Sequence, residues 1–249
     1  MLKQSFAILL ATTLLLSGCG NPTAPAKETK LIVTTFIPYY VFTQNLVGEN
    51  ATVINIINNT QEPHDYQLKP SEIVTLQKAD LIIRNGLGLD DWVKEAAEKS
   101  GTKATIITAS DYITPLAPQS ILELDPNSTG STDEDANFDP HIWVSPKNVL
   151  QILPHITAAL SNIDPDHQTA YQKQLQQYSD RITILDKTVA EQLKPFAQKE
   201  FISFHEAFQY FARDYGLVSA IAIEAYPGKE PTPRYLQALI EKIKASNIK

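Results

Sequence analysis

Three histidines lie where a metal ion could be bound. His64 follows one apolar run, His141 precedes a Ser-Pro pair that can start a helix, and His205 ends another apolar run. We therefore expect all three at turns between strands and helices, at the edge of an α/β sheet where ligands collect. Neutral imidazole is a common ligand of first-row metal ions, and several rings can form a tetrahedral Zn²⁺ site. Because the three residues are far apart in the sequence, only tertiary structure can assemble such a site.

Other residues suited to this chemistry are few. His155 and His167 lack a comparable setting, and we expect them to be structural or exposed. Cys19 is the single cysteine, which excludes internal disulfides, zinc ribbons, iron–sulfur clusters and a cysteine nucleophile in the folded body. A metal site must therefore use histidine, aspartate and glutamate.

Composition and charge narrow the class of protein. The chain has 249 residues, of which 43% are hydrophobic and 20% charged, as in globular proteins with a packed core. Its 28 acidic side chains outnumber the 21 basic ones, and the formal net charge is −7 at pH 7. Proteins that bind nucleic acid usually have the opposite balance. We expect no nucleic-acid partner.

The N-terminal segment predicts export and a lipid anchor. Residues 1–18 combine one basic residue with an apolar run that is typical of a signal peptide and too short to span a bilayer. The end of this segment, Leu16-Ser17-Gly18-Cys19, resembles a bacterial lipobox, whose cysteine is lipidated and becomes the new N-terminus. We expect Cys19 to be lipidated and residues 19–30 to form a tether. The protein would then be anchored on the extracytoplasmic side of a bacterial membrane, in the periplasm or at the cell surface.

The mature chain alternates between two kinds of segment. Apolar runs rich in β-branched residues alternate with helix-length segments, which predicts an α/β fold with a mostly parallel sheet. The expected strands are 31–36, 53–57, 81–83 and 105–108. Gly48, Gly101 and Gly216 each follow an amphipathic segment, where a helix ends in a left-handed residue.

One long helix is expected between Pro165 and Leu193. Its apolar residues recur every three or four positions, and neither glycine nor proline interrupts it after Pro165. At 1.5 Å per residue it would be about 43 Å long, enough to join two lobes. We therefore expect an N-terminal lobe over 31–164, a linking helix over 165–194 and a C-terminal lobe over 195–249.

The C-terminal lobe is expected to be small. It would contain strands at 200–204 and 217–223 and helices at 206–215 and 233–245. Two strands make a poor sheet for an independent lobe, so we expect this lobe to be incomplete in the present sequence. Five aromatic residues near His205 are expected in its core: Phe204, Phe208, Tyr210, Phe211 and Tyr215.

Four motifs, in this order, resemble the metal-binding receptors of zinc and manganese ABC importers. They are Pro63-His64-Asp65-Tyr66 with the residues up to Ser71, Gly86-Leu87-Gly88-Leu89-Asp90-Asp91-Trp92, Asp139-Pro140-His141-Ile142-Trp143, and the segment from His205 to Leu217. The resemblance covers residues 31–249. It implies two Rossmann-like α/β lobes joined by a long rigid helix, with the metal in the cleft between them.

The resemblance also implies the ligands and the function. It assigns His64, His141 and His205 as metal ligands, and a histidine in the third place resembles the zinc branch of the family, since manganese receptors tend to have glutamate there. The fourth, carboxylate ligand of the family would lie beyond Lys249. The implied function is capture of Zn²⁺ and its delivery to an ABC permease, without catalysis. We expect the mature receptor to be monomeric.

Three alternatives remain open at this stage. A Mn²⁺ receptor, or one that binds both ions, would differ only in its metal. A zinc hydrolase would use the same three ligands, an open water position, and Glu62 or Glu206 as general base. An adhesin would use the acidic loop 123–139, which lacks the histidines found in many zinc receptors. For any site made of three imidazoles with ordinary pKa values near 6.5, metal binding is expected to weaken from about pH 7 to pH 5.

Overall fold

The computed structural model describes residues 29–58, 61–64, 66–118, 138–224 and 230–246. The predicted signal peptide 1–18 and the lipidation site Cys19 lie outside the described residues, as does most of the acidic loop 123–139. Those assignments therefore stay predictions. Among the described helices, none is both long and apolar enough to cross a membrane.

A four-stranded parallel sheet forms the centre of the larger part of the molecule. Its strands are β1 (Lys30–Thr34), β2 (Ala51–Asn55), β3 (Leu81–Arg84) and β4 (Thr105–Thr108), in the order β2-β1-β3-β4. The chain therefore moves outward from β1 in one direction to β2 and in the other to β3 and β4. In open α/β sheets, the crevice at such a switch point, outside the carboxyl ends of the strands, is the usual ligand site.

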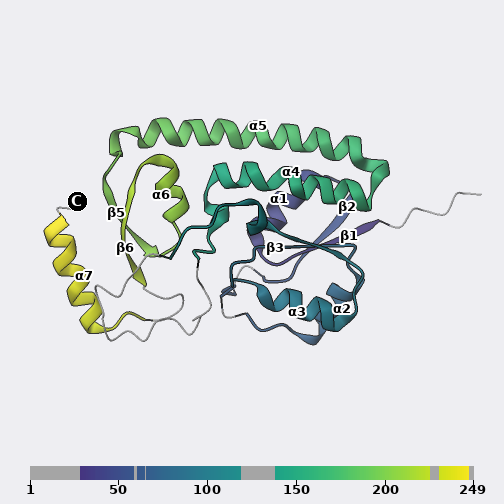
Figure 1. The fold of residues 1–249 in the computed structure, drawn as a ribbon, viewed down its shortest axis with the longest axis horizontal. Helices are drawn as coiled ribbons and strands as arrows, with labels where there is room; N and C mark the ends of the chain where they lie inside the picture. Colours follow the sequence, from purple (N-terminus) through teal and green to yellow (C-terminus); the bar gives the residue numbers. More distant parts are fainter. Residues whose placement is uncertain (1–28, 59–60, 65, 119–137, 225–229, 247–249) are drawn as a thin grey trace, which may run out of the picture.

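Helices cover both faces of this sheet (Figure 1). One face packs against α1 (Ile37–Val47) and α4 (Pro146–Ile163), while α2 (Pro70–Lys78) and α3 (Asp91–Ser100) lie on the other side. The buried strand residues are mostly isoleucine, leucine and valine, as expected for a parallel sheet covered on both faces. Ser145 accepts a hydrogen bond from the backbone N–H of Asn148 and so caps α4 ahead of Pro146.

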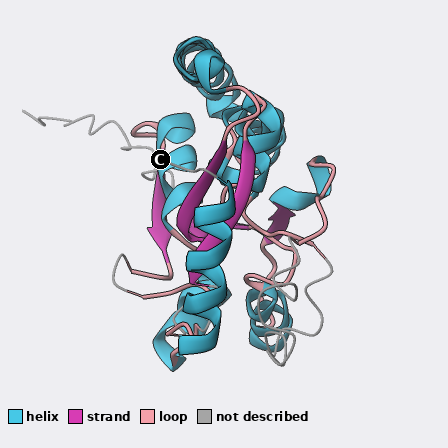
Figure 2. Ribbon diagram, turned by 90° about the vertical axis from the view of Figure 1, so that its left-hand side faces the viewer, coloured by secondary structure: helices cyan, strands magenta, loops and turns pink. Residues whose placement is uncertain are grey.

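The second part contains two parallel strands. β5 (Glu200–His205) and β6 (Val218–Glu224) are joined through α6 (Gln209–Tyr215), and α7 (Pro233–Ser246) follows β6. Figure 2 shows the molecule turned by 90° about the vertical axis.

The mixed α/β class with parallel sheets is confirmed by the pairing of the strands in both sheets. The helix expected from Glu206 begins only at Gln209, because the backbone N–H of Ala207 turns back to the carbonyl of His205.

The long helix predicted from the sequence is confirmed. A 3₁₀ turn at Pro165–His167 leads into α5 (Gln168–Leu193), whose 26 residues span about 39 Å. Figure 1 shows α5 running along the top of the molecule, over α4 and on to the start of β5. Tyr171 and Tyr178 are its buried side chains, and Asp186 accepts a 2.8 Å hydrogen bond from Tyr215 at the end of α6.

The expected aromatic core of the second part is only partly present. Tyr210 and Tyr215 are buried, but Phe204 is 65% exposed and Phe208 is 38% exposed. The core prediction for Phe204 and Phe208 is therefore wrong. Adjacent side chains of a strand point to opposite faces, so with Ser203 buried, Phe204 must point the other way. That face of β5 is open to solvent in the part of the chain that the structure describes.

Candidate metal centre

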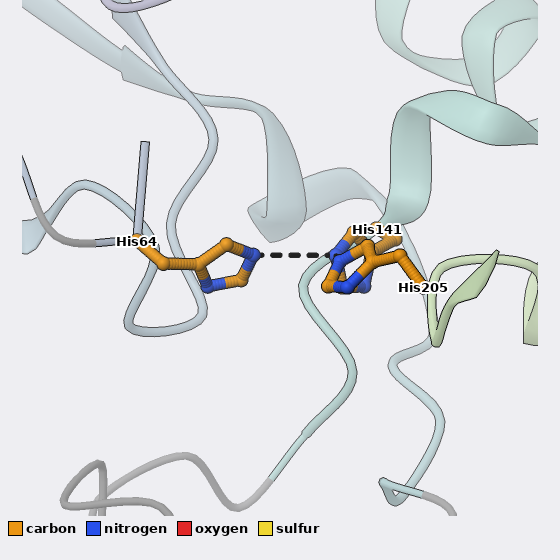
Figure 3. A group of neighbouring side chains, drawn as sticks. All are labelled: His64, His141 and His205. Atoms are coloured by element: carbon orange, nitrogen blue, oxygen red, sulfur yellow. Dashed lines mark hydrogen bonds between the residues drawn. The ribbon is translucent and has the colours of Figure 1, made fainter. Parts of the chain in front are cut away.

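The three predicted histidines converge on one point. The Nε2 atoms of His64 and His141 are 3.3 Å apart, and those of His205 and His141 are 3.0 Å apart. One ligand atom from each of the three residues lies within 4.8 Å of the others. Figure 3 shows His64 reaching in from one side, with His141 and His205 on the other. Sequence separations of 77 and 64 residues are thus closed by the fold.

Each histidine is placed by a different element. His64 lies in the segment between β2 and α2, and His205 is the last residue of β5. His141 precedes a 3₁₀ turn at Ile142–Val144, which leads into α4. The setting predicted for His205, at the end of a strand, is therefore confirmed, while His141 is separated from its helix by the extra turn.

A carboxylate fixes the ring of His141. Oδ1 of Asp139 accepts hydrogen bonds from Nδ1 of His141 at 2.7 Å and from its backbone N–H at 2.9 Å. Both side chains are buried. With the proton on Nδ1, the lone pair of His141 is on Nε2, which faces His64 and His205. Such carboxylate–histidine pairs orient metal ligands and increase their basicity.

The switch point of the sheet supports the segment that contains His141. Asn85, the residue after β3, donates from Nδ2 to the carbonyl of Pro140 at 2.9 Å, and its Oδ1 accepts from the hydroxyl of Tyr39 at 2.6 Å. Asp90 closes the loop after β3 by accepting from the backbone N–H groups of Asn85 and Gly86 at 2.7 and 2.8 Å. This hydrogen-bonded loop lies at the carboxyl end of β3, beside β1, as the strand order requires.

Gly86 is required by both space and backbone conformation in this loop. Its φ of 88° lies in the region that side chains disfavour. A Cβ atom there would also collide with Oγ of Ser110. Gly86 therefore allows the loop after β3 to pass close to the segment that follows β4.

Burial keeps two of the three imidazoles neutral. It lowers the pKa of His64 to about 3, with further lowering from the neighbouring His141 and His205. Burial also lowers the pKa of His205 to about 4, helped by His141 and opposed by Asp139. Neutral rings at physiological pH are the form that binds a metal.

Two of the three nitrogen separations are close to those of a tetrahedral zinc site. Zn²⁺–N bonds of about 2.0–2.1 Å place two ligand nitrogens about 3.3–3.4 Å apart in a tetrahedron. The two separations that involve Nε2 of His141, 3.3 and 3.0 Å, are close to this value. Besides Asp139, Glu62 is a carboxylate near the group: its Oε1 lies 4.0 Å from Nε2 of His64, and its side chain is 51% exposed. The three nitrogens could therefore hold Zn²⁺ with a water molecule or a carboxylate in the fourth position.

The remaining histidines do not join this group. His155 is exposed and stacks on the ring of Tyr112 with the centroids 3.6 Å apart. Nδ1 of His167 lies 2.6 Å from the carboxylate of Asp164 at the start of the long helical segment. Both therefore have structural or exposed positions, as the sequence predicted.

Sequence reasoning missed the residues that support the three histidines. In the sequence, Asp139 belongs to the Asp139–Trp143 motif and ends the acidic loop, but no contact with His141 is expected for it, and neither Asn85 nor Tyr39 stands out. The Asp-Pro-His spacing could have indicated Asp139, since a carboxylate two residues before a histidine can reach its backbone N–H. The sequence holds no comparable local signal for Asn85, which acts across the fold.

The chain is similar to known zinc-uptake proteins. Residues 32–249 match the family model ZnuA, described as the zinc-uptake complex component A, periplasmic. The high-affinity zinc uptake system protein ZnuA of Bacillus subtilis is 33% identical over 248 residues, which cover 97% of this chain and 77% of that protein. The zinc-binding lipoprotein AdcA of Streptococcus pneumoniae is 32% identical over 251 residues, covering 100% of this chain but 49% of AdcA.

The fold comparison gives a similar result. A crystal structure of ZnuA superposes with a TM-score of 0.76 at 29% sequence identity, covering 88% of this chain and 80% of that one. The agreement includes the α/β architecture. The chain spans about half the length of AdcA and about three quarters of the length of the Bacillus protein.

Proposed function

Because the chain belongs to the ZnuA family of zinc-uptake components, we propose that it is an extracytoplasmic receptor that captures Zn²⁺ and delivers it to an ABC importer. Its proposed ligands are His64, His141 and His205. The observation that supports them best is the convergence of one ligand nitrogen from each histidine within 4.8 Å of the others.

The type of ligand favours zinc over manganese. Imidazole nitrogen suits Zn²⁺, whereas Mn²⁺ prefers carboxylate, carbonyl and water oxygens. All three members of the converging group are histidines, and two of them have a lowered pKa. A Mn²⁺ receptor would need more oxygen ligands than this group supplies.

The proposed role is binding without catalysis. Release follows from the position of the ligands: His64 lies beside the four-stranded sheet, and His205 ends a strand of the other sheet. A permease that moves these two parts away from each other would break the shared geometry and lower the affinity for the ion. A hydrolase would instead need to keep the ion bound through every turnover.

The attachment to the membrane is part of the proposal. Lipidation of Cys19 after removal of residues 1–18 would hold a monomeric receptor on the extracytoplasmic side of the membrane, near its permease. The relative AdcA is named a lipoprotein, which supports this assignment. The lobes 31–164 and 195–249 and the linking helix 165–194 are proposed as the units that move.

Calorimetric titration of the metal-free soluble chain with Zn²⁺ tests the function. We expect one zinc ion per chain, and loss of most of the affinity on replacing His64, His141 or His205 by alanine. His155→Ala is a matched control, because His155 is exposed and stacks on Tyr112. Equal affinities of the ligand variants and the control would contradict the assignment.

A further inference from the structure

Tyr210 joins the two parts of the molecule at a buried point next to the metal centre. Its hydroxyl donates to the carbonyl of Asp139 at 2.7 Å and accepts from the backbone N–H of Leu116 at 3.1 Å. The backbone N–H of Asp139 in turn donates to the carbonyl of Leu116 at 2.8 Å. Tyr210 is fully buried. One hydroxyl thus closes a ring of hydrogen bonds around Asp139.

These residues come from opposite sides of the proposed cleft. Tyr210 lies on α6, between the two strands of the smaller sheet, while Leu116 and Asp139 belong to the part that contains the four-stranded sheet. Asp139 is also the residue whose Oδ1 holds Nδ1 of His141 at 2.7 Å. A continuous path of hydrogen bonds therefore leads from α6 to a proposed ligand.

The same helix is close to a second proposed ligand. His205 ends β5 only a short turn before α6, and the backbone N–H of Ala207 donates to the carbonyl of His205 at 3.0 Å. The position of α6 consequently affects both His141 and His205, whose Nε2 atoms are 3.0 Å apart. His64 enters from the other side of the group (Figure 3).

The other polar contacts of α6 lead elsewhere. Asp214 accepts hydrogen bonds from the hydroxyl of Ser145 and, through its carbonyl, from Nζ of Lys147. Arg213 donates to Oδ1 of Asn148 at 3.2 Å. These contacts fasten α6 to the first turn of α4. Among the described contacts of α6, the hydroxyl of Tyr210 is the one that reaches Asp139.

We propose that Tyr210 is a positioning residue of the metal site: through Asp139 it holds Nε2 of His141 at binding distance from Nε2 of His205 before the ion arrives. This proposal rests on the proposed function, since it assumes that these histidines bind zinc. It divides the site into a preformed pair, His141 and His205, and a third ligand, His64, that completes it.

The hydroxyl of Tyr210 can fill both hydrogen-bonding roles across the physiological pH range. Burial raises its pKa to about 12, so the group keeps its proton. Replacement by phenylalanine would keep the ring and its contact with the guanidinium of Arg213, whose Cζ lies 5.2 Å from the ring centroid. It would remove the partner of two backbone groups and leave Asp139 less constrained.

A comparison of two tyrosines on the same helix tests the proposal. Tyr210→Phe and Tyr215→Phe each remove one hydroxyl from α6, but the hydroxyl of Tyr215 binds Asp186 on α5 and leads to no proposed ligand. Both variants should lower the melting temperature of the metal-free chain. Competition with a chromogenic chelator should show a zinc affinity about tenfold lower for Tyr210→Phe, within the range known for partners of metal ligands. Tyr215→Phe should keep the original affinity.

A double-mutant cycle with Asp139→Asn tests the path and provides a second variant if Tyr210→Phe folds poorly. Asp139→Asn alone should lower the zinc affinity, and the two substitutions together should cost less than the sum of the separate losses, because both act on His141. Four results would overturn the positioning role and leave the zinc receptor standing. Two concern the tyrosines: an unchanged zinc affinity in Tyr210→Phe, or equal losses in Tyr210→Phe and Tyr215→Phe. The other two are an unchanged zinc affinity in Asp139→Asn and strictly additive losses in the double variant. Absence of zinc binding by the unaltered chain would overturn both.

Discussion

Nε2 of His141 lies 3.0 Å from Nε2 of His205, although one residue precedes α4 and the other ends a strand of the smaller sheet. Two neutral imidazole nitrogens at this distance either share a proton or direct two lone pairs at a common cation. The proton of His141 is held at Nδ1 by Asp139, which leaves its Nε2 as an acceptor. This arrangement makes the residue at position 205 decisive for the choice of metal.

Replacement of His205 by glutamate should change that choice. The substitution exchanges an imidazole nitrogen for a harder carboxylate oxygen, which suits Mn²⁺ better than Zn²⁺. We expect the ratio of Mn²⁺ to Zn²⁺ affinity to rise on the order of tenfold, equal to about 1.4 kcal/mol. Competition titrations measure the ratio, with His155→Glu as the exposed control. An unchanged ratio in His205→Glu would remove His205 from the proposed ligands.

The pH dependence should be set by the pKa values of the folded chain. In the metal-free protein the pKa is lowered to about 3 for His64 and about 4 for His205. Protons therefore compete with zinc at these two residues only in acid, so their contribution to the affinity should change little from about pH 7 to pH 5 and fall below that. This window is lower than the one predicted from the ordinary pKa of histidine. A loss of affinity between pH 7 and pH 6 that is steeper than one proton per zinc ion would contradict it.

The stability of the metal-free chain should depend on the same two groups. Histidines of the unfolded chain bind protons below about pH 6.5, while the folded chain keeps His64 and His205 neutral down to about pH 4. The unfolded state thus binds more protons in this window, so the melting temperature should fall as the pH falls through it. Replacing both residues by glutamine should reduce the slope, and an unchanged slope would argue against their lowered pKa values.

Much of the fold could be predicted from local sequence patterns. The strand at 105–108 matches β4, and the first three strands are displaced by at most two residues at either end, because β-branched runs and helix-ending glycines are local signals. The exposure of Phe204 could not be predicted, since the alternation along β5 does not reveal which face is covered. Likewise, the motifs predict that the three histidines form one group. They do not predict the hydrogen bond from Tyr210 to Asp139, which joins residues 71 positions apart. It depends on where α6 packs, and short sequence patterns do not contain that information.

Two glycines of one loop should respond differently to alanine. Gly86 and Gly88 have φ values of 88° and 84°, so both substitutions introduce backbone strain. Only at Gly86 would the new Cβ collide with Ser110, whereas nothing lies within 4 Å of a Cβ at Gly88. In denaturant unfolding we expect a loss of about 1 kcal/mol for Gly88→Ala and about 2–4 kcal/mol for Gly86→Ala. Equal losses would show that the collision is relieved without cost.

The lipid anchor can be tested independently of metal binding. If Cys19 is lipidated, a radiolabelled fatty acid should be incorporated into the protein, which should sediment with the membrane fraction. Cys19→Ser should abolish the label and release the protein, because no other cysteine is present in the chain. Continued membrane association of the unlabelled variant would show that the anchor lies elsewhere.

X-ray absorption spectroscopy of the zinc-loaded chain at the zinc K-edge tests the central claim most directly. We predict a first shell of nitrogen and oxygen atoms at about 2.0–2.1 Å, with the outer-shell scattering of three imidazole rings. The imidazole scattering should drop to that of two rings in His205→Ala and stay at three rings in His155→Ala. A first shell with fewer than three imidazoles in the unaltered chain, or one that His205→Ala leaves unchanged, would contradict a zinc site formed by His64, His141 and His205.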